Sequence, residues 1–418
     1  MKFKKEYGCL ILCLAIFAAC SEPEEKVAEE DPLPVLEKVN MFIETSASMG
    51  GYFQKDAAFK TVLSDLTIKI HNNISPVSLY FIGEKTEPYP HEINQFSSDI
   101  ATTRIAKDRS SEIHKIVEEI AEKTDSTTVS IFVSDFILSF PDEEIRKNPE
   151  INRYEAPNAL KNNIFNTFAV MNKSGFNASI YAFTSKFYGD YFDYGNRKTT
   201  LNGTNRPYYI LVLGKKHLLD KFNEQLKNIN TFKPEQFLHF GAMDETIRQY
   251  EIFTQVGRSG EWSVDGNNIK GVNRSSGEGS QFTLGFDLSS LPSYVQEEEY
   301  LSQNLQVDCE GCNVSFEIME KEDISEKPTR KREIEALEKN THLFVFNVED
   351  MALGTANLNL KLPLRFDNWY LDWSTDDDRN ITDMGHKTFA LEHMINGIKE
   401  VYENNNTYYI ESEIQLNQ

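Results

Sequence analysis

The stretch VNMFIETSASMGG, residues 39–51, decides the fold of this chain. Residues 39–44 have the apolar composition of a buried strand, and residues 45–51 form a short run of hydroxyl-bearing and small side chains typical of a tight loop. The next segment carries Phe59, Leu63, Leu66 and Ile70 on one face of an amphipathic helix. Strand, loop and helix in this order predict the start of an α/β domain, which binds ligands beyond the carboxyl ends of its strands.

The same alternation continues to about residue 240 and predicts a mostly parallel sheet covered by helices. Strands are expected at residues 39–44, 77–83, 128–136, 177–183 and 207–214. Helical periodicity marks residues 59–70, 113–120, 160–171 and 218–229. Residues 84–103 and 188–205 have loop composition and are expected to be insertions.

The hydrophobic period changes to two after a Gly, Ser and Asn-rich joint near residues 256–280. Half-buried antiparallel strands alternate in this way, so a β-rich, sandwich-like domain with a C-terminal helix is expected. That helix, residues 391–402, packs either on this domain or back on the first one. The expected division is a signal peptide at 1–19, an acidic tether at 20–36, the α/β domain at 37–255 and the β-rich domain at 256–418.

The loop Glu-Thr-Ser-Ala-Ser-Met-Gly at residues 44–50 resembles the metal-ion-dependent adhesion site of the von Willebrand factor A family. The family motif is Asp-x-Ser-x-Ser, so Ser46 and Ser48 match its serines and Glu44 stands where the family has Asp. The resemblance covers about 200 residues and implies a doubly wound, von Willebrand factor A-like sheet.

The resemblance also implies a hydroxyl from a second loop and an Asp at the end of a later strand. Ser111 matches the hydroxyl, with Ser110 as its competitor, and Asp135 matches the acid, although Phe136 follows where the family often has Gly. Oxygen ligands suit Mg²⁺ or Mn²⁺. The resemblance implies that such an ion is bound by Glu44, in the outer shell, and by Ser46, Ser48, Ser111 and Asp135.

A structural alternative needs no metal ion. Ser46 or Ser48 could cap the helix that follows, and Asp135 could hold a turn.

The N-terminus has the form of a secretory signal peptide: three lysines, an apolar run too short for a permanent membrane helix, and two alanines before Cys20. The Ala-Ala-Cys junction resembles a bacterial lipobox, which implies an acylated Cys20; ordinary signal cleavage near the alanines is the alternative. The Ser and Glu cluster behind Cys20 is similar to the surface-export signal of Bacteroidota lipoproteins, and an ordinary disordered linker is the alternative. We therefore expect a lipid-anchored protein of the outer membrane, on its periplasmic or cell-surface side.

Loss of residues 1–19 removes three Lys and one Glu and takes the formal charge from −22 to −24. Nucleic-acid binding needs a basic face, so nucleic acid is not an expected partner. In the remaining chain only Cys309 and Cys312 can pair, and they are expected to form a disulfide across a hairpin, with a redox role as the alternative. Residues 367–380 are expected to form a solvated loop beside two core tryptophans, with sugar or calcium binding by the aromatic and acidic side chains as the alternative.

The leading functional hypothesis is a binding module that holds a protein or other envelope ligand through a carboxylate bound to the metal ion. A metal-assisted envelope hydrolase is the enzymatic alternative, disfavoured because the sequence shows no pair of nucleophile and base. A third possibility is a structural subunit of an envelope assembly with a vestigial metal site, and Glu44 in place of Asp is its main support.

Overall fold

The computed structural model describes residues 34–55, 57–102, 105–106, 112–138, 147, 149–241, 246–272, 279–325, 327–352, 354–403 and 408–418. Val35–Gln418 form one compact unit. The expected signal peptide, Cys20, most of the tether, Ser110 and Ser111 lie outside the described residues. Within the described ranges, no helix combines the length and apolarity needed to cross a membrane.

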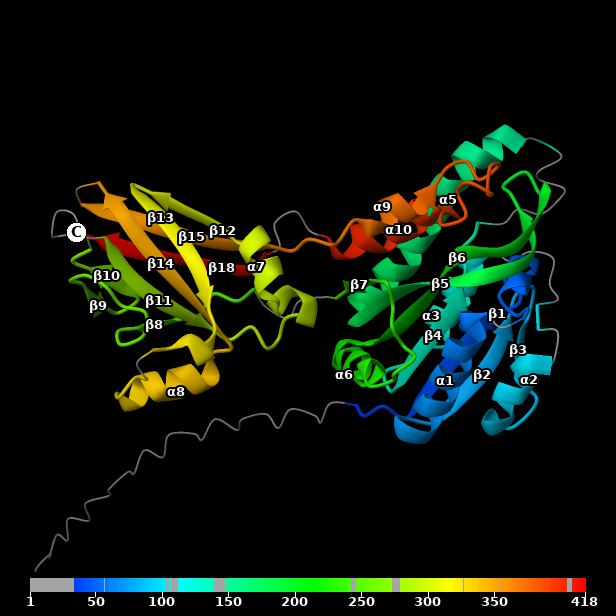
Figure 1. Cartoon of the computed structure of the whole chain (residues 1–418), viewed down its shortest axis with the longest axis horizontal. Coiled ribbons are helices and arrows are strands. Elements are labelled where there is room, and N and C mark those ends of the chain that lie inside the picture. The colour runs from blue at the N-terminus through cyan, green and yellow to red at the C-terminus, as the bar shows by residue number, and fades with distance from the viewer. Residues whose placement is uncertain are drawn as a thin grey trace, which may run out of the picture. The chain divides into compact units, whose positions relative to one another are not determined.

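A seven-stranded sheet with the order β3-β2-β1-β4-β6-β5-β7 lies at the centre of the α/β part (Figure 1). Its strands are β1 (Lys38–Glu44), β2 (Val77–Ile82), β3 (Thr86–Pro88), β4 (Thr128–Ser134), β5 (Phe176–Phe192), β6 (Lys198–Lys215) and β7 (Gln236–Phe240). β1 pairs parallel with β2 and with β4, and β5 points the same way, whereas β3, β6 and β7 run the opposite way. The structure confirms the predicted α/β class and the predicted mostly parallel central sheet.

Helices cover both faces of this sheet because its central strands are buried on both sides. Every residue of β1 after Lys38 is buried, as expected for a strand between two layers of helices. One layer contains α1 (Ala58–Asn73), α2 (Phe96–Thr102) and α6 (Lys216–Lys227). The other contains α3 (Ile113–Glu122), α5 (Pro149–Lys173) and α10 (Leu391–Tyr402). The four predicted helices of the α/β region are therefore present.

The prediction of an insertion at residues 188–205 is wrong, because these residues continue β5 and β6 as a long hairpin. Strands joined by so short a turn must pair antiparallel, which is why the sheet changes direction beyond β4. Tyr191 and Leu201 are buried in this hairpin, so tertiary packing overrides its loop-like composition. The other expected insertion, residues 84–103, contains β3, the 3₁₀ turn η2 (Ile93–Gln95) and α2.

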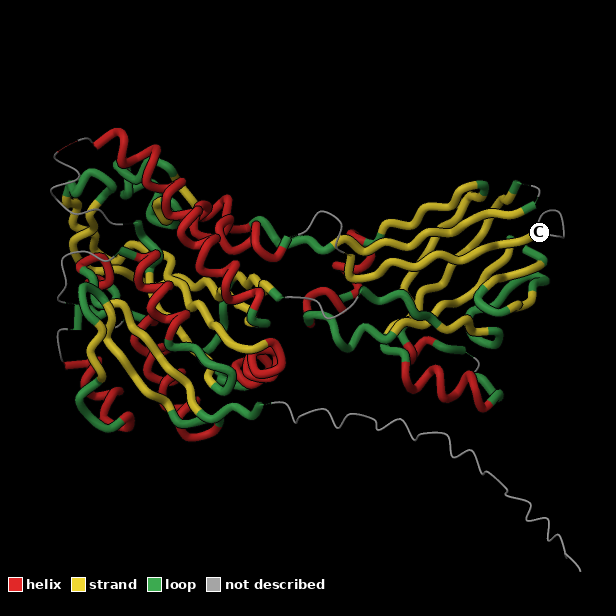
Figure 2. The backbone as a smooth tube through the Cα atoms, turned by 180° about the vertical axis from the view of Figure 1, so that it is seen from behind, coloured by secondary structure: helices red, strands yellow, loops and turns green. Residues whose placement is uncertain are grey.

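The β-rich part consists of a five-stranded sheet, β12-β15-β18-β10-β9, and a four-stranded sheet, β13-β14-β11-β8. Figure 2 shows these strands from the other side, with the C-terminus at the end of β18. The strands are β8 (Glu251–Phe253), β9 (Ser263–Asp265), β10 (Asn268–Lys270), β11 (Ser280–Phe286), β12 (Gln306–Glu310), β13 (Cys312–Met319), β14 (His342–Met351), β15 (Thr355–Pro363) and β18 (Tyr408–Asn417). Its helical segments are η3 (Ser293–Gln296), α7 (Glu298–Asn304), η4 (Lys321–Asp323) and α8 (Lys331–Lys339).

Cys309 and Cys312 are bonded to each other, with Cα atoms 5.3 Å apart. The hairpin expected around them is wrong. Cys309 lies in β12, which pairs with β15, while Cys312 begins β13, which pairs with β14 in the other sheet. The disulfide therefore spans the turn that carries the chain from one sheet to the other.

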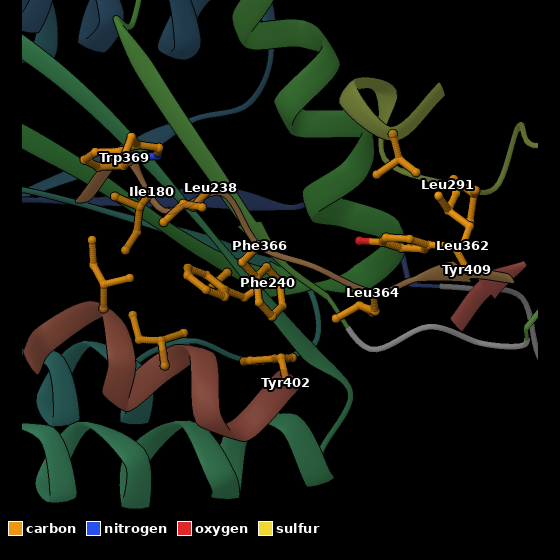
Figure 3. Packing of buried hydrophobic residues seen from close by; sticks show 14 of the residues in the cluster. Ile180, Leu238, Phe240, Leu291, Leu362, Leu364, Phe366, Trp369, Tyr402 and Tyr409 are labelled. Carbon is orange, nitrogen blue, oxygen red and sulfur yellow. The ribbon is translucent and has the colours of Figure 1, made fainter. Parts of the chain in front are cut away.

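The chain returns to the α/β part between β15 and β18. This excursion contains α9 (Trp369–Trp373), β16 (Ser374–Thr375), β17 (Thr388–Phe389) and α10. Helix α10 lies so close to α5 that a Cβ on Gly397 would stand 2.6 Å from the carbonyl oxygen of Lys161. Phe366 packs on Phe240 of β7 with ring centroids 4.9 Å apart, beside Tyr402 of α10 (Figure 3). Of the two placements expected for the C-terminal helix, the structure has the one on the first domain.

Candidate metal site

The residues predicted to bind a metal ion lie at one edge of the sheet. Glu44 ends β1, and Asp135 directly follows β4. The two strands are parallel neighbours with Ile43 opposite Val133, so their carboxyl ends meet. The 3₁₀ turn η1 (Ala47–Gly51) starts at this edge and carries Ser48. Ser111, the fourth expected ligand, lies outside the described residues.

The two serine hydroxyls converge instead of capping a helix. Ser46 occupies the N-cap position of η1, but its side chain makes no capping hydrogen bond. Its Oγ lies 2.9 Å from the Oγ of Ser48, and Ser48 in turn hydrogen-bonds with Asp135. The N-cap alternative for Ser46 is therefore wrong, and the loop gathers three oxygen-bearing side chains at one point.

Asp135 has one oxygen with a structural role and one without. Its Oδ1 accepts a hydrogen bond from the backbone N–H of Ile137 at 3.2 Å, as the turn alternative predicts. Its Oδ2 is buried and has no hydrogen-bond partner among the described residues. Burial and the neighbouring carboxylate of Glu44 raise the pKa of Asp135 to about 7, although Arg206 acts in the opposite direction. A buried acid with a spare oxygen suits a cation or another polar ligand.

Glu44 is fixed by a hydrogen bond from the last residue of β4. Its Oε2 accepts a hydrogen bond from the hydroxyl of Ser134, whose Oγ accepts in turn from the N–H of Phe136 at 2.8 Å. Phe136 has φ +54°, in the left-handed region that favours glycine. Its ring stacks on Tyr209 with centroids 5.0 Å apart, and this packing stabilises the strained backbone.

Arg206 completes the site and was not predicted from the sequence. It lies in β6 with 0 % of its surface exposed, and its guanidinium carbon is 4.4 Å from the ring centroid of Tyr191. Nη1 donates to the carbonyl oxygens of Gly385 at 3.2 Å and Lys387 at 3.3 Å. Its Nε and Nη2 have no hydrogen-bond partner within the described part of the chain. A buried arginine that acts electrostatically on Asp135 supplies a fixed positive charge.

The expected solvated loop at residues 367–380 is partly wrong, because Asp378 is fully buried. Its oxygens accept hydrogen bonds from the hydroxyl of Tyr191 and from the N–H of Tyr194 at 3.0 Å. Burial raises the pKa of Asp378, while the hydrogen bond from Tyr191 lowers it. Asp378 thus joins the excursion between β15 and β18 to the hairpin that carries Tyr191.

That hairpin also lies against the serine loop. A Cβ on Gly51 would stand 2.3 Å from the ring of Phe187, and a Cβ on Gly189 would stand 3.2 Å from the Cα of Gly51. Glycine at both positions lets β5 approach η1 this closely. As a result Glu44, Ser46, Ser48 and Asp135 are all buried in the structure.

The residues present fit a hard divalent cation in donor type and charge. All the described donors are oxygens, which Mg²⁺ and Mn²⁺ prefer. Glu44 and Asp135 outweigh the charge of Arg206 when both are ionised, so negative charge remains for a cation. Within the described ranges no group of three or more His, Cys, Asp or Glu side chains could hold a metal. An ion would therefore depend on the serine hydroxyls.

No protein-family model matches this chain, no curated protein matches it, and no solved structure matches it.

Proposed function

We propose that this chain is an exported lipoprotein, acylated on Cys20, whose α/β part is a von Willebrand factor A-like binding module of the outer membrane. Ser46, Ser48 and Asp135 would hold Mg²⁺ or Mn²⁺, with Glu44 in the outer shell and Ser111 as a further ligand. The observation that carries the proposal is the pair of hydroxyls 2.9 Å apart beside the buried, unpartnered Oδ2 of Asp135. A bound ion would supply a positive charge that attracts a carboxylate of a partner.

The protein's own residues prepare the site for such a ligand. Ser134 holds Glu44, and the Ile137 N–H orients Asp135, so both acids are positioned before any ion arrives. The hairpin of β5 and β6 lies over the loop and would exclude water from it. A charge interaction is stronger in a desolvated crevice than in water. Exclusion of water by the hairpin therefore favours tight binding of a carboxylate once the hairpin allows that carboxylate to reach the loop.

A second candidate is a structural subunit of an envelope assembly, with a vestigial metal site. Arg206 favours it, because its buried guanidinium interacts electrostatically with Asp135 and offers the positive charge that an ion would bring. The hydrolase alternative stays a prediction.

Calorimetric titration of the purified chain with Mg²⁺ and Mn²⁺, together with thermal melts, separates the two candidates. An ion that binds only the folded state adds about 2.7 kcal/mol at a hundred times its dissociation constant. We expect wild type to gain this stability and Asp135→Asn to gain none. Asp125→Asn is the matched control, because Asp125 precedes β4 and its Oδ1 accepts from the Thr127 N–H at 3.0 Å, away from the site.

Identical melts with Mg²⁺ and with chelator for wild type, and no heat on titration, would refute the metal site and favour the structural subunit. A metal response retained in Asp135→Asn would refute the ligand assignment. Affinity capture from intact envelopes with and without chelator then tests whether partner binding depends on the ion.

A further inference from the structure

A cavity of about 840 Å³ lies beside α6, away from the serine loop. Its walls come from β5, α6, β7, the segment that includes η3, and Tyr409 of β18. Cavities of this volume are typical of small-molecule sites. Leu291 and Tyr409, which both line it, are shown with the surrounding apolar residues in Figure 3.

Three buried polar side chains form a hydrogen-bonded chain in this wall. Asn223 Nδ2 donates to Ser179 Oγ at 2.8 Å, and Ser179 Oγ lies 2.9 Å from Nδ1 of His239. The Ser179 oxygen accepts from Asn223 and still has a proton that it can donate to Nδ1 of His239. Burial, and then the charge of Lys216, lower the pKa of His239 to about 4, so the ring is neutral. In the tautomer whose Nδ1 accepts from Ser179, the ring proton is on Nε2.

Two of these side chains offer opposite hydrogen-bonding groups to a ligand. Nε2–H of His239 is a donor, and Asp220 Oδ1 is 3.7 Å away, beyond direct hydrogen-bond distance. Oδ1 of Asn223 is a buried acceptor with no partner in the described part of the chain. A hydroxyl group can accept from the first and donate to the second, whereas a carboxylate cannot donate and an ammonium cannot accept.

Gly241 keeps this polar wall unobstructed. A Cβ at this position would stand 2.7 Å from His239 Nε2 and 2.8 Å from Asn177 Nδ2. Its φ is not in the left-handed region, so backbone conformation does not require glycine here. Glycine instead keeps a side chain away from both nitrogens.

Aromatic rings form the apolar walls of the cavity. Tyr181 packs on Phe232 and Phe237 with ring centroids 4.9 and 4.7 Å apart, and Phe237 contacts Tyr294 at 6.3 Å. The hydroxyls of Tyr294 and Tyr409 lie 3.2 Å apart. Aromatic faces beside polar tips suit ligands that have both C–H faces and hydroxyls.

The charges around the cavity balance. Lys216, Lys221 and Lys227 line it together with Asp220, Glu224 and Glu297. Lys227 pairs with Glu224 at 2.7 Å, and Lys216 lies 3.9 Å from Asp220. A balanced rim selects neither an anion nor a cation.

We propose that this cavity binds a neutral saccharide, with a sugar hydroxyl between His239 Nε2 and Asn223 Oδ1 and a ring face against the aromatic walls. This site is independent of the serine loop and of any ion bound there. It would give the protein a second ligand of the glycan class.

The test is saturation-transfer NMR on the full folded chain with the methyl glycosides of glucose, galactose, mannose and N-acetylglucosamine. Glucuronate and glucosamine serve as the charged probes. We expect at least one neutral glycoside to bind and to exceed both charged sugars. Asn223→Leu, which removes the acceptor, should weaken that binding about tenfold or more.

Gly241→Ser is the second variant, because it places a side chain against His239 and decides the question if Asn223→Leu does not fold. Asn228→Leu is the matched control: it lies at the exposed end of α6, donates to Glu224 O at 3.4 Å, and should bind as wild type does. The proposal is overturned if no neutral glycoside binds, if a charged sugar binds better, or if binding is unchanged in both Asn223→Leu and Gly241→Ser.

Discussion

Replacing Arg206 with methionine tests the electrostatic balance of the buried site. The side chain has no exposed surface, so the substitution takes a charge out of the interior and leaves Asp135 without the positive charge of Arg206. It also leaves the carbonyl oxygens of Gly385 and Lys387 without a donor and removes a guanidinium from the face of Tyr191. Breaking a buried charge pair in this way costs about 3–5 kcal/mol of unfolding free energy.

The assay is equilibrium unfolding in urea, with Arg258→Met as the control. Arg258 also lies over an aromatic ring, 4.2 Å from the centroid of Trp262, and donates to backbone carbonyls, but it is exposed. Its replacement should cost no more than about 1 kcal/mol. A loss for Arg206→Met as small as that of Arg258→Met would refute the claim that burial makes this charge important.

The double variant Arg206→Met with Asp135→Asn isolates the interaction between the two groups. Neutralising Asp135 removes the acid that lacks a counter-charge, so the double variant should be about 1–3 kcal/mol more stable than the two single losses predict. Additive losses would show that Arg206 acts only through its carbonyl and ring contacts.

Two further predictions concern other buried groups. The folded pKa of His239 is about 4 and the unfolded value about 6.5, so between those pH values only the unfolded state takes up this proton. In urea unfolding from pH 7 to 4, wild type should therefore lose up to about 3 kcal/mol more unfolding free energy than His239→Gln. Parallel pH profiles for the two proteins would contradict this. Phe136→Gly should lower the unfolding free energy in urea by about 2–3 kcal/mol, less than Phe132→Gly does. Both variants lose a buried ring, but glycine also relieves the positive φ of residue 136. An equal or larger loss for Phe136→Gly would contradict the strain argument.

Much of the α/β fold could be predicted because its signals are local. The runs that became β1, β2 and β4 are largely apolar, since helices cover both faces of the sheet. The convergence of Ser46, Ser48 and Asp135 also follows from sequence, because neighbouring parallel strands end at the same edge of a sheet. The hairpin of β5 and β6 could not be predicted in this way. Its polar, glycine-containing stretch becomes strand only through pairing and through burial of residues such as Tyr191.

Arg206 and Asp378 show most clearly what the sequence could not predict. An arginine within a strand and an aspartate in an acidic run are usually exposed, and composition gives no reason to bury either one. Each is buried because of partners far away in the chain: Arg206 donates to Gly385 and Lys387, and Asp378 accepts from Tyr191. The burial of a charge is decided by such tertiary partners, which no local pattern encodes.

Arg206 acts on Asp135 as a positive charge, and a bound Mg²⁺ would be an alternative source of that charge. If the ion binds, saturating Mg²⁺ should restore part of the stability lost in Arg206→Met, because it neutralises the Asp135 carboxylate that the variant leaves uncompensated. If the site is vestigial, the loss will be the same with Mg²⁺ and with chelator. Urea unfolding of Arg206→Met under both conditions therefore distinguishes a metal-dependent binding module from a subunit in which an arginine has taken the place of the ion.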